Sequence, residues 1–259
     1  MPLTLKSANI KYLILGAGGL GLALRALLYA TGTDARGLLI RGHWAGIGLW
    51  LVTAVTVLGI FLLTRPLTGS KDYQRAFPKS PAAAAGCAAA AAGILLNLTP
   101  GSRGTSLENV ELILAGTAIV SLLVLAFCRF TGRKPSALFH CLVCVYLAVR
   151  MVGQYRLWSS IPQLQDYCFY LGAHVALMLT AYQFAAFDAG LGNHRTLWAW
   201  GLASMYLCCL SLVGDGQRLL MLCCGIWVYT NLSHLRSRRR EEKSTQPEQG
   251  AEGAADASA

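Results

Sequence analysis

The chain has 259 residues, of which 55% are apolar and 13% are charged, about half the charged fraction of an ordinary soluble domain. A water-soluble enzyme of this length needs more polar surface, so these numbers argue against one, and against a fibrous or largely disordered chain. The net charge of +10 would suit a nucleic-acid-binding protein, but the positions of the lysines and arginines indicate membrane topology instead, and we expect no nucleic-acid partner.

Eight stretches are long and apolar enough to cross a bilayer as helices. A hydrocarbon core of about 30 Å needs about 20 apolar helical residues, and backbone polar groups in lipid must be satisfied within the helix. The predicted spans are, in chain order, residues 10–30, 44–64, 80–98, 112–128, 135–149, 167–187, 196–214 and 219–235. We therefore predict an all-α polytopic transmembrane helical bundle of about eight spans, with residues 1–235 as the membrane domain.

The first span admits two interpretations. Lys6 and Lys11 before an apolar run resemble a secretory signal peptide. However, Arg25 interrupts the run, and no clean Ala-x-Ala cleavage site follows it. An uncleaved membrane anchor is the favoured interpretation.

The distribution of basic residues predicts the orientation of the spans. Of the 22 lysines and arginines, 15 fall on the side that holds the N-terminus and six on the other, with Arg25 inside a span. Because cytoplasmic loops carry the excess of lysine and arginine, we expect both termini in the cytoplasm. The expected location is a cell membrane, crossed several times; a bacterial plasma membrane is favoured, and a eukaryotic origin stays open.

The C-terminal segment, residues 236–259, is predicted to be a basic and then disordered cytoplasmic tail. Four arginines follow the last span directly and would contact anionic lipid headgroups: Arg236, Arg238, Arg239 and Arg240. The remaining residues are mostly Glu, Gln, Ala, Gly and Ser, which offer little to bury in a core.

Two predicted spans are rich in small residues. The first contains Gly16, Gly18 and Gly21, and the third is largely alanine between residues 83 and 92. Small residues let helix backbones approach closely, so both helices are expected inside the bundle, packed against each other or along a path. The glycines also match the dinucleotide-binding pattern G-x-G-x-x-G, but no acidic residue follows about 20 positions later, so we expect no cofactor.

Nine cysteines raise the question of metal or redox chemistry. They include a C-x-x-C pair at Cys141 and Cys144, beside His140. All nine lie in or at the ends of apolar spans, where cysteine behaves as a small hydrophobic residue. We expect structural cysteines and no metal site.

Ionisable residues at membrane depth are the best candidates for function, because they are costly to place there. Two stripes at i, i+4, i+8 spacing lie on consecutive spans, Tyr146, Arg150 and Gln154 on the fifth and Asp166, Tyr170 and His174 at the start of the sixth. A hairpin would put both stripes at a similar depth, with Arg150 paired to Asp166. Arg25 and Glu111 are expected at comparable depth, whereas His140 and Gln183 are expected to make interhelical hydrogen bonds.

The eight residues Arg25, Glu111, Tyr146, Arg150, Gln154, Asp166, Tyr170 and His174 form the predicted polar pocket for a small anionic or zwitterionic solute. The alternative is that these groups pair with one another and only fix helix packing. The first functional hypothesis is a transporter, or the membrane subunit of one. The second is a membrane-embedded sensor or assembly partner of an unidentified cytoplasmic protein. We do not expect an enzyme, although a lipid-modifying membrane enzyme stays open as a third possibility.

Overall fold

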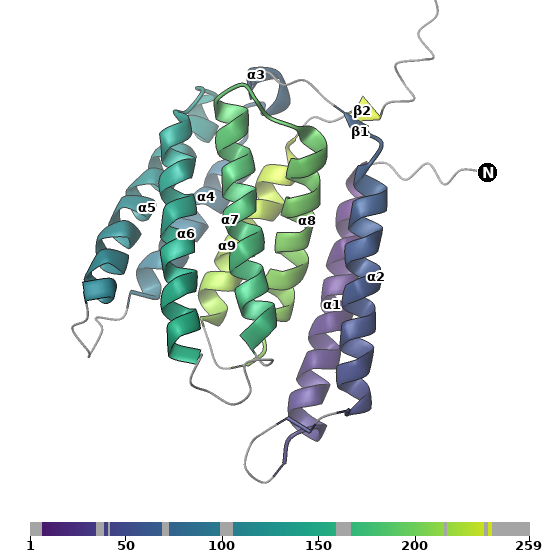
Figure 1. Cartoon of the computed structure of the whole chain (residues 1–259). Helices are drawn as coiled ribbons and strands as arrows, with labels where there is room; N and C mark the ends of the chain where they lie inside the picture. The colour runs from purple at the N-terminus through teal and green to yellow at the C-terminus, as the bar shows by residue number, and fades with distance from the viewer. Residues whose placement is uncertain are drawn as a thin grey trace, which may run out of the picture.

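The computed structural model describes residues 7–34, 39–40, 42–68, 73–98, 106–158, 167–214, 217–235 and 238–239. Within these ranges the chain forms eight long helices, which run side by side in Figure 1, and the one-turn helix α3 (Tyr73–Ala76). The long helices are α1 (Ser7–Thr31), α2 (Trp44–Thr64), α4 (Pro81–Leu96), α5 (Ser106–Thr131), α6 (Ala137–Trp158), α7 (Cys168–Asp188), α8 (His194–Leu210) and α9 (Arg218–Ser233). The prediction of a helical architecture is confirmed.

Local sequence signals determine where several helices begin and end. The Ser80 hydroxyl accepts a hydrogen bond from the Ala83 amide at 3.2 Å, and Pro81 occupies the first turn of α4. Asn193 caps α8 in the same way, through the Arg195 amide. At the other end of helices, Gly132 follows α5 and Gly190 follows α7, both with φ near +80°, the conformation that stops a helix at little cost for glycine.

Six of the helices form a closed ring in the order α4, α5, α6, α7, α8, α9. Each of them packs against the next, and α9 packs back against α4. Helices α1 and α2 form a hairpin outside this ring, seen to the right in Figure 1, and α1 packs against α8. The ring therefore has an interior that α1 and α2 do not line.

Within the described ranges, five helices are long and apolar enough to cross a membrane: α1, α2, α5, α6 and α7. The protein is thus a multi-pass membrane protein. Helices α4, α8 and α9 have 16 or 17 residues, which corresponds to about 24–26 Å of helix and falls short of the hydrocarbon thickness. They lie within the same ring, and a total of eight spans stays a prediction.

The first and last helices meet at one end of the molecule. The Lys11 ammonium near the start of α1 lies 6.0 Å from the centre of the Tyr229 ring near the end of α9. At this end, strand β1 (Leu67–Thr68) pairs antiparallel with strand β2 (Arg238–Arg239). The compartment that this end faces stays a prediction, as does lipid contact by the basic segment; residues 240–259 lie outside the described ranges.

Both helices rich in small residues pack closely, but not as a pair. Gly86 and Gly93 of α4 face α9, where an added Cβ at Gly93 would meet the Cys223 Cβ at 2.6 Å. Gly18 and Gly21 of α1 face α8, and an added Cβ at Gly21 would meet Leu210 at 2.8 Å. Each small-residue face is therefore matched to a different neighbour.

Candidate functional site

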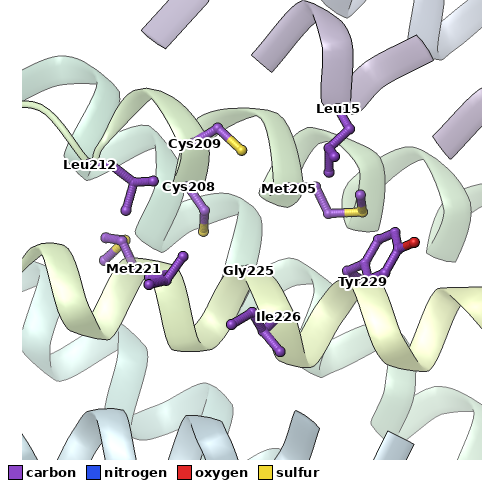
Figure 2. Close-up of a pocket in the computed structure, with 10 residues that line it drawn as sticks. Leu15, Met205, Cys208, Cys209, Leu212, Met221, Gly225, Ile226 and Tyr229 are labelled. Carbon is purple, nitrogen blue, oxygen red and sulfur yellow. The ribbon is translucent and has the colours of Figure 1, made fainter. Parts of the chain in front are cut away.

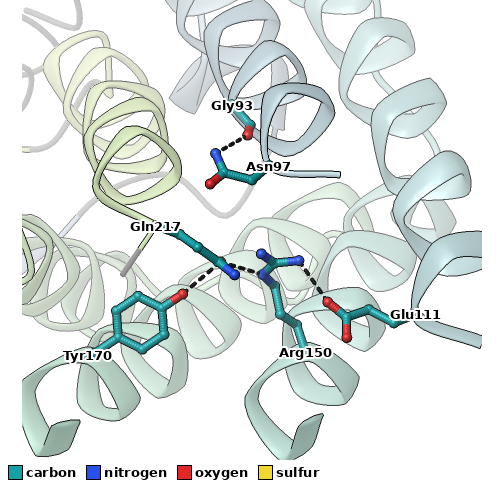
Figure 3. A network of polar contacts seen from close by, with 6 residues as sticks. All are labelled: Gly93, Asn97, Glu111, Arg150, Tyr170 and Gln217. Carbon is teal, nitrogen blue, oxygen red and sulfur yellow. Dashed lines mark hydrogen bonds and ion pairs between the residues drawn. The ribbon is translucent and has the colours of Figure 1, made fainter. Parts of the chain in front are cut away.

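A buried arginine on α6 links four elements of the ring. Arg150 donates from Nη1 to Glu111 Oε1 at 2.7 Å and from Nε to Gln217 Oε1 at 2.8 Å. The Tyr170 hydroxyl donates to the same oxygen of Gln217 at 2.7 Å (Figure 3). We name Glu111, Arg150, Tyr170 and Gln217 the arginine network. It joins α5, α6 and α7 to the residue that precedes α9.

The two charges of the network differ in accessibility. The Arg150 side chain is 4% exposed, whereas the Glu111 side chain is 21% exposed. The pair balances its own charge, so the guanidinium is not left uncompensated in the bundle. Glu111 is therefore the more accessible member of this ion pair.

Two further predicted residues lie beside the network and are fully buried. His174 lies one turn after Tyr170, and its Nδ1 is 3.0 Å from the Tyr170 carbonyl oxygen. Because a carbonyl oxygen only accepts, this bond requires the imidazole hydrogen on Nδ1. Nε2 has no hydrogen-bond partner within the described part of the chain. The Tyr146 ring centre lies 5.8 Å from the Arg150 guanidinium carbon.

The remaining predicted site residues are placed differently. Gln154 is half-buried, one turn beyond Arg150. Asp166 lies outside the described residues, and so does the predicted pair between Asp166 and Arg150; the bonds described for Arg150 go to Glu111 and Gln217. Gln217 was missed by the sequence analysis, although a polar residue two positions before the last predicted span was a usable signal.

Arg25 is not brought to the arginine network. It lies where α1 meets α8, donates from Nη1 to the Leu210 carbonyl oxygen at 2.7 Å, and places its guanidinium carbon 5.3 Å from the Phe169 ring centre. The carbonyl belongs to the last residue of α8, where unpaired carbonyls favour a cation. Arg25 therefore fixes the hairpin to the ring from outside.

A second buried polar group lies at the opposite ends of α6 and α7. His140 Nδ1 and Asp188 Oδ2 are 2.5 Å apart, with side chains 3% and 1% exposed. This bond confirms the expected interhelical hydrogen bond of His140. Gln183 also makes one, since it accepts from the Thr196 hydroxyl at 2.9 Å. Asp188 was missed as a buried residue because it is the last residue of α7, and a charged residue at that position was interpreted as the end of the membrane span.

Arg129 is buried close to that pair, among aromatic side chains. Its guanidinium carbon lies 4.0 Å from the Phe77 ring centre and 5.2 Å from that of Tyr73. Among the described residues, its Nη2 and the Asp188 Oδ1 have no hydrogen-bond partner. Burial raises the pKa of Tyr73 to about 12, an effect that the neighbouring Arg129 charge opposes. From the sequence, Arg129 was counted only as one of the 15 basic residues that indicate the orientation of the spans.

Within the described ranges, the cysteines and acidic side chains form no disulfide and no metal-binding group. None of the nine cysteines forms a disulfide. No group of three His, Cys, Asp or Glu side chains there is arranged to hold a metal ion. No family model, curated protein or solved structure matches the chain.

Proposed function

We propose that this protein is a plasma-membrane carrier for a small anionic or zwitterionic solute, or the membrane subunit of such a carrier. A bacterial membrane is favoured by the asymmetry of its lysines and arginines. The observation that carries the proposal is a buried arginine inside a closed helical ring whose carboxylate partner is the more accessible of the two. Ionisable residues inside a membrane bundle commonly mark solute or ion pathways.

The solute would bind by exchange with Glu111. A carboxylate entering from the Glu111 end has the same charge and shape as the Glu111 side chain, so it can replace that side chain on the Arg150 guanidinium. A planar guanidinium binds a carboxylate through two parallel hydrogen bonds, which gives selectivity for carboxylates over rounder anions. The exchange leaves Arg150 paired, and the released Glu111 carboxylate must then be stabilised by water or by a proton, which its 21% exposed side chain can reach.

Polar groups along α6 and α7 support a path through the ring. His140 precedes Arg150 by ten residues on α6, about 15 Å along the helix axis. Tyr146 lies between them, and His174 lies on the neighbouring helix α7. A carrier needs groups that can receive its solute from both sides of the membrane, and the buried His140–Asp188 pair supplies a candidate at the second side.

Uptake into vesicles made with the purified protein tests this function. Small carboxylates and amino acids are offered one at a time to wild type, Arg150→Ala and Glu111→Gln. We expect at least about a tenfold loss of uptake of the true solute in Arg150→Ala, the size of one lost charge-assisted interaction. Arg156→Ala, which removes an exposed arginine from the same helix, is the matched control and should keep wild-type uptake.

Equal flux in wild type and Arg150→Ala for every solute would remove the carrier proposal. Glu111→Gln separates exchange from simple structural pairing. If the solute competes with Glu111, the neutral amide weakens the internal competitor, and the apparent KM falls. If Glu111 only holds the helices together, the variant loses thermal stability and its KM does not fall.

The alternative function is a membrane-embedded sensor or assembly partner that acts through a cytoplasmic protein. The observation that favours it is that Arg150, Glu111 and Gln217 already bond to one another, which can hold the ring in one conformation. Purification in mild detergent separates the two proposals. A soluble protein that copurifies at one copy per chain would favour the sensor, provided that wild type and Arg150→Ala take up every tested solute equally.

A further inference from the structure

An apolar groove lies between α1, α8 and α9, on the outside of the ring. It encloses about 300 Å³, roughly ten times the volume that one water molecule occupies in the liquid. Met205 and Cys208 of α8 and Met221 of α9 form its buried floor (Figure 2). We name this space the side groove.

The side groove opens toward the surface that hydrocarbon would cover. Its rim consists of Leu15, Leu222 and Ile226, each more than 40% exposed. Between Met221 and Tyr229 the groove follows α9 for eight residues, about 12 Å parallel to the helix axis. An apolar cavity of this kind does not hold water well, and empty it forfeits packing contacts along its walls.

A buried lysine stands at one end of the groove. Lys11 lies one turn before Leu15 on α1, is 9% exposed, and places its ammonium 6.0 Å from the ring centre of Tyr229, which lines the groove. Within the described part of the chain, no carboxylate or hydrogen-bond acceptor is found for Lys11. The Lys11 side chain is mostly buried at the end of an apolar groove and faces no anion among the described residues, so this position favours a negatively charged ligand.

We propose that the side groove binds one anionic phospholipid, with an acyl chain along α8 and α9 and the phosphate at Lys11. The apolar rim and the length of the groove suit an acyl chain, and the ammonium at its end suits a phosphate. A zwitterionic phospholipid carries a cation beside its phosphate, which would repel Lys11 and weaken binding. This lipid site is separate from the arginine network and does not depend on the proposed transport function.

Native mass spectrometry of the purified full-length chain tests the proposal. The protein is offered equal amounts of phosphatidylglycerol and phosphatidylcholine with identical acyl chains. We expect wild type to retain one phosphatidylglycerol with about a tenfold preference, since a charge-assisted contact contributes at that level. Lys11→Gln should reduce this preference to near equality, and Lys11→Arg should preserve it.

Lys79 provides the matched control for the charge. It is an exposed lysine whose ammonium lies 5.5 Å from the Phe130 ring centre, away from the groove. Lys79→Gln should retain the lipid as wild type does. Equal retention of the two lipids by wild type, or an equal loss in Lys79→Gln and Lys11→Gln, would overturn the proposal.

Gly225 provides a test of the groove itself. An added Cβ there would lie 3.4 Å from the Cys208 Cβ, an ordinary contact, so a larger side chain can enter the groove without breaking the helix packing. Gly225→Leu should lose the retained lipid, whereas Gly16→Leu on the open face of α1 should keep it. Unchanged phosphatidylglycerol retention in Gly225→Leu would contradict the assignment of the groove.

Discussion

Arg150 and Asp188 lie near opposite ends of the same helical ring, and each is paired with a residue of a neighbouring helix. A charged side chain in a membrane helix is costly, up to about 2.5–3.5 kcal/mol at the helix centre on insertion scales and less toward the helix ends. The Glu111 carboxylate offsets this cost for Arg150, and the His140 imidazole does so for Asp188. Removing one member of such a pair leaves the other buried without a partner, which is worse than removing both.

The His140–Asp188 pair gives a residue-scale prediction about stability. His140→Ala should lower the free energy of unfolding by about 3 kcal/mol, because it leaves the Asp188 carboxylate buried without its partner. Asp188→Ala should have a smaller effect, because an imidazole left without a partner is cheaper to bury than a carboxylate. The double variant should be less destabilised than the sum of the two single variants. Thermal unfolding in detergent, followed by helical circular dichroism, measures all three; additive losses would show that the pair contributes no coupling.

At the scale of elements, the approach of α4 to α9 depends on missing side chains. A Cβ at Gly86 would lie 2.0 Å from the Thr230 hydroxyl oxygen and 3.2 Å from the Trp227 Cα. Real Cβ contacts are not that short, so the two helices would have to separate. In a membrane, where helix association depends on van der Waals packing, such a face largely determines which neighbour a helix accepts.

Gly86→Ala should therefore destabilise the protein by about 1–3 kcal/mol, the usual cost of overpacking. Gly116→Ala on α5 is the matched control, because nothing lies within 4 Å of an added Cβ there. It should be neutral or stabilising by up to about 1 kcal/mol, since alanine favours the helix. The test compares the midpoints of thermal unfolding of the two variants in the same detergent. Equal midpoints would contradict the close packing of α4 against α9 at Gly86.

At the scale of the whole molecule, the arrangement predicts topology. A total of eight spans places the N- and C-termini in the same compartment, and the segment 159–166, which five spans precede, in the other. Fluorescent or enzymatic reporters at both ends, and an accessible epitope between residues 159 and 166, should report cytoplasm, cytoplasm and outside. Termini in opposite compartments would require an odd number of spans and would reassign one of the short helices α4, α8 and α9 to a membrane surface.

Much of the fold followed from where charges interrupt apolar runs. The predicted span 44–64 has the same bounds as α2, because charged residues are absent from it and Arg65 follows directly. The span 167–187 differs from α7 by one residue at each end. The prediction was least accurate for α6, which continues to Trp158, nine residues beyond the predicted end at residue 149, because the charge of Arg150 was taken as the end of the span although the helix runs on through it.

The site was predicted in part, for a reason that concerns helix geometry. Spacing at i and i+4 correctly put Tyr146 with Arg150, and Tyr170 with His174, on common helix faces. It does not say which helix stands opposite. The bonded partners of Arg150 are 39 and 67 residues away in the chain, so only the packing order of the ring brings them together.

The closure of α4 on α9 has a consequence for biosynthesis. The ribosome completes α4 more than 100 residues before α9, on the order of ten seconds earlier at common rates of elongation. Until then, this alanine-rich segment has α5 as a neighbour but lacks the surface that its glycines match. A nascent chain released before residue 218 would thus leave the ring open at that seam, and quality-control proteases that survey the bilayer would find there the most weakly held helix of the molecule.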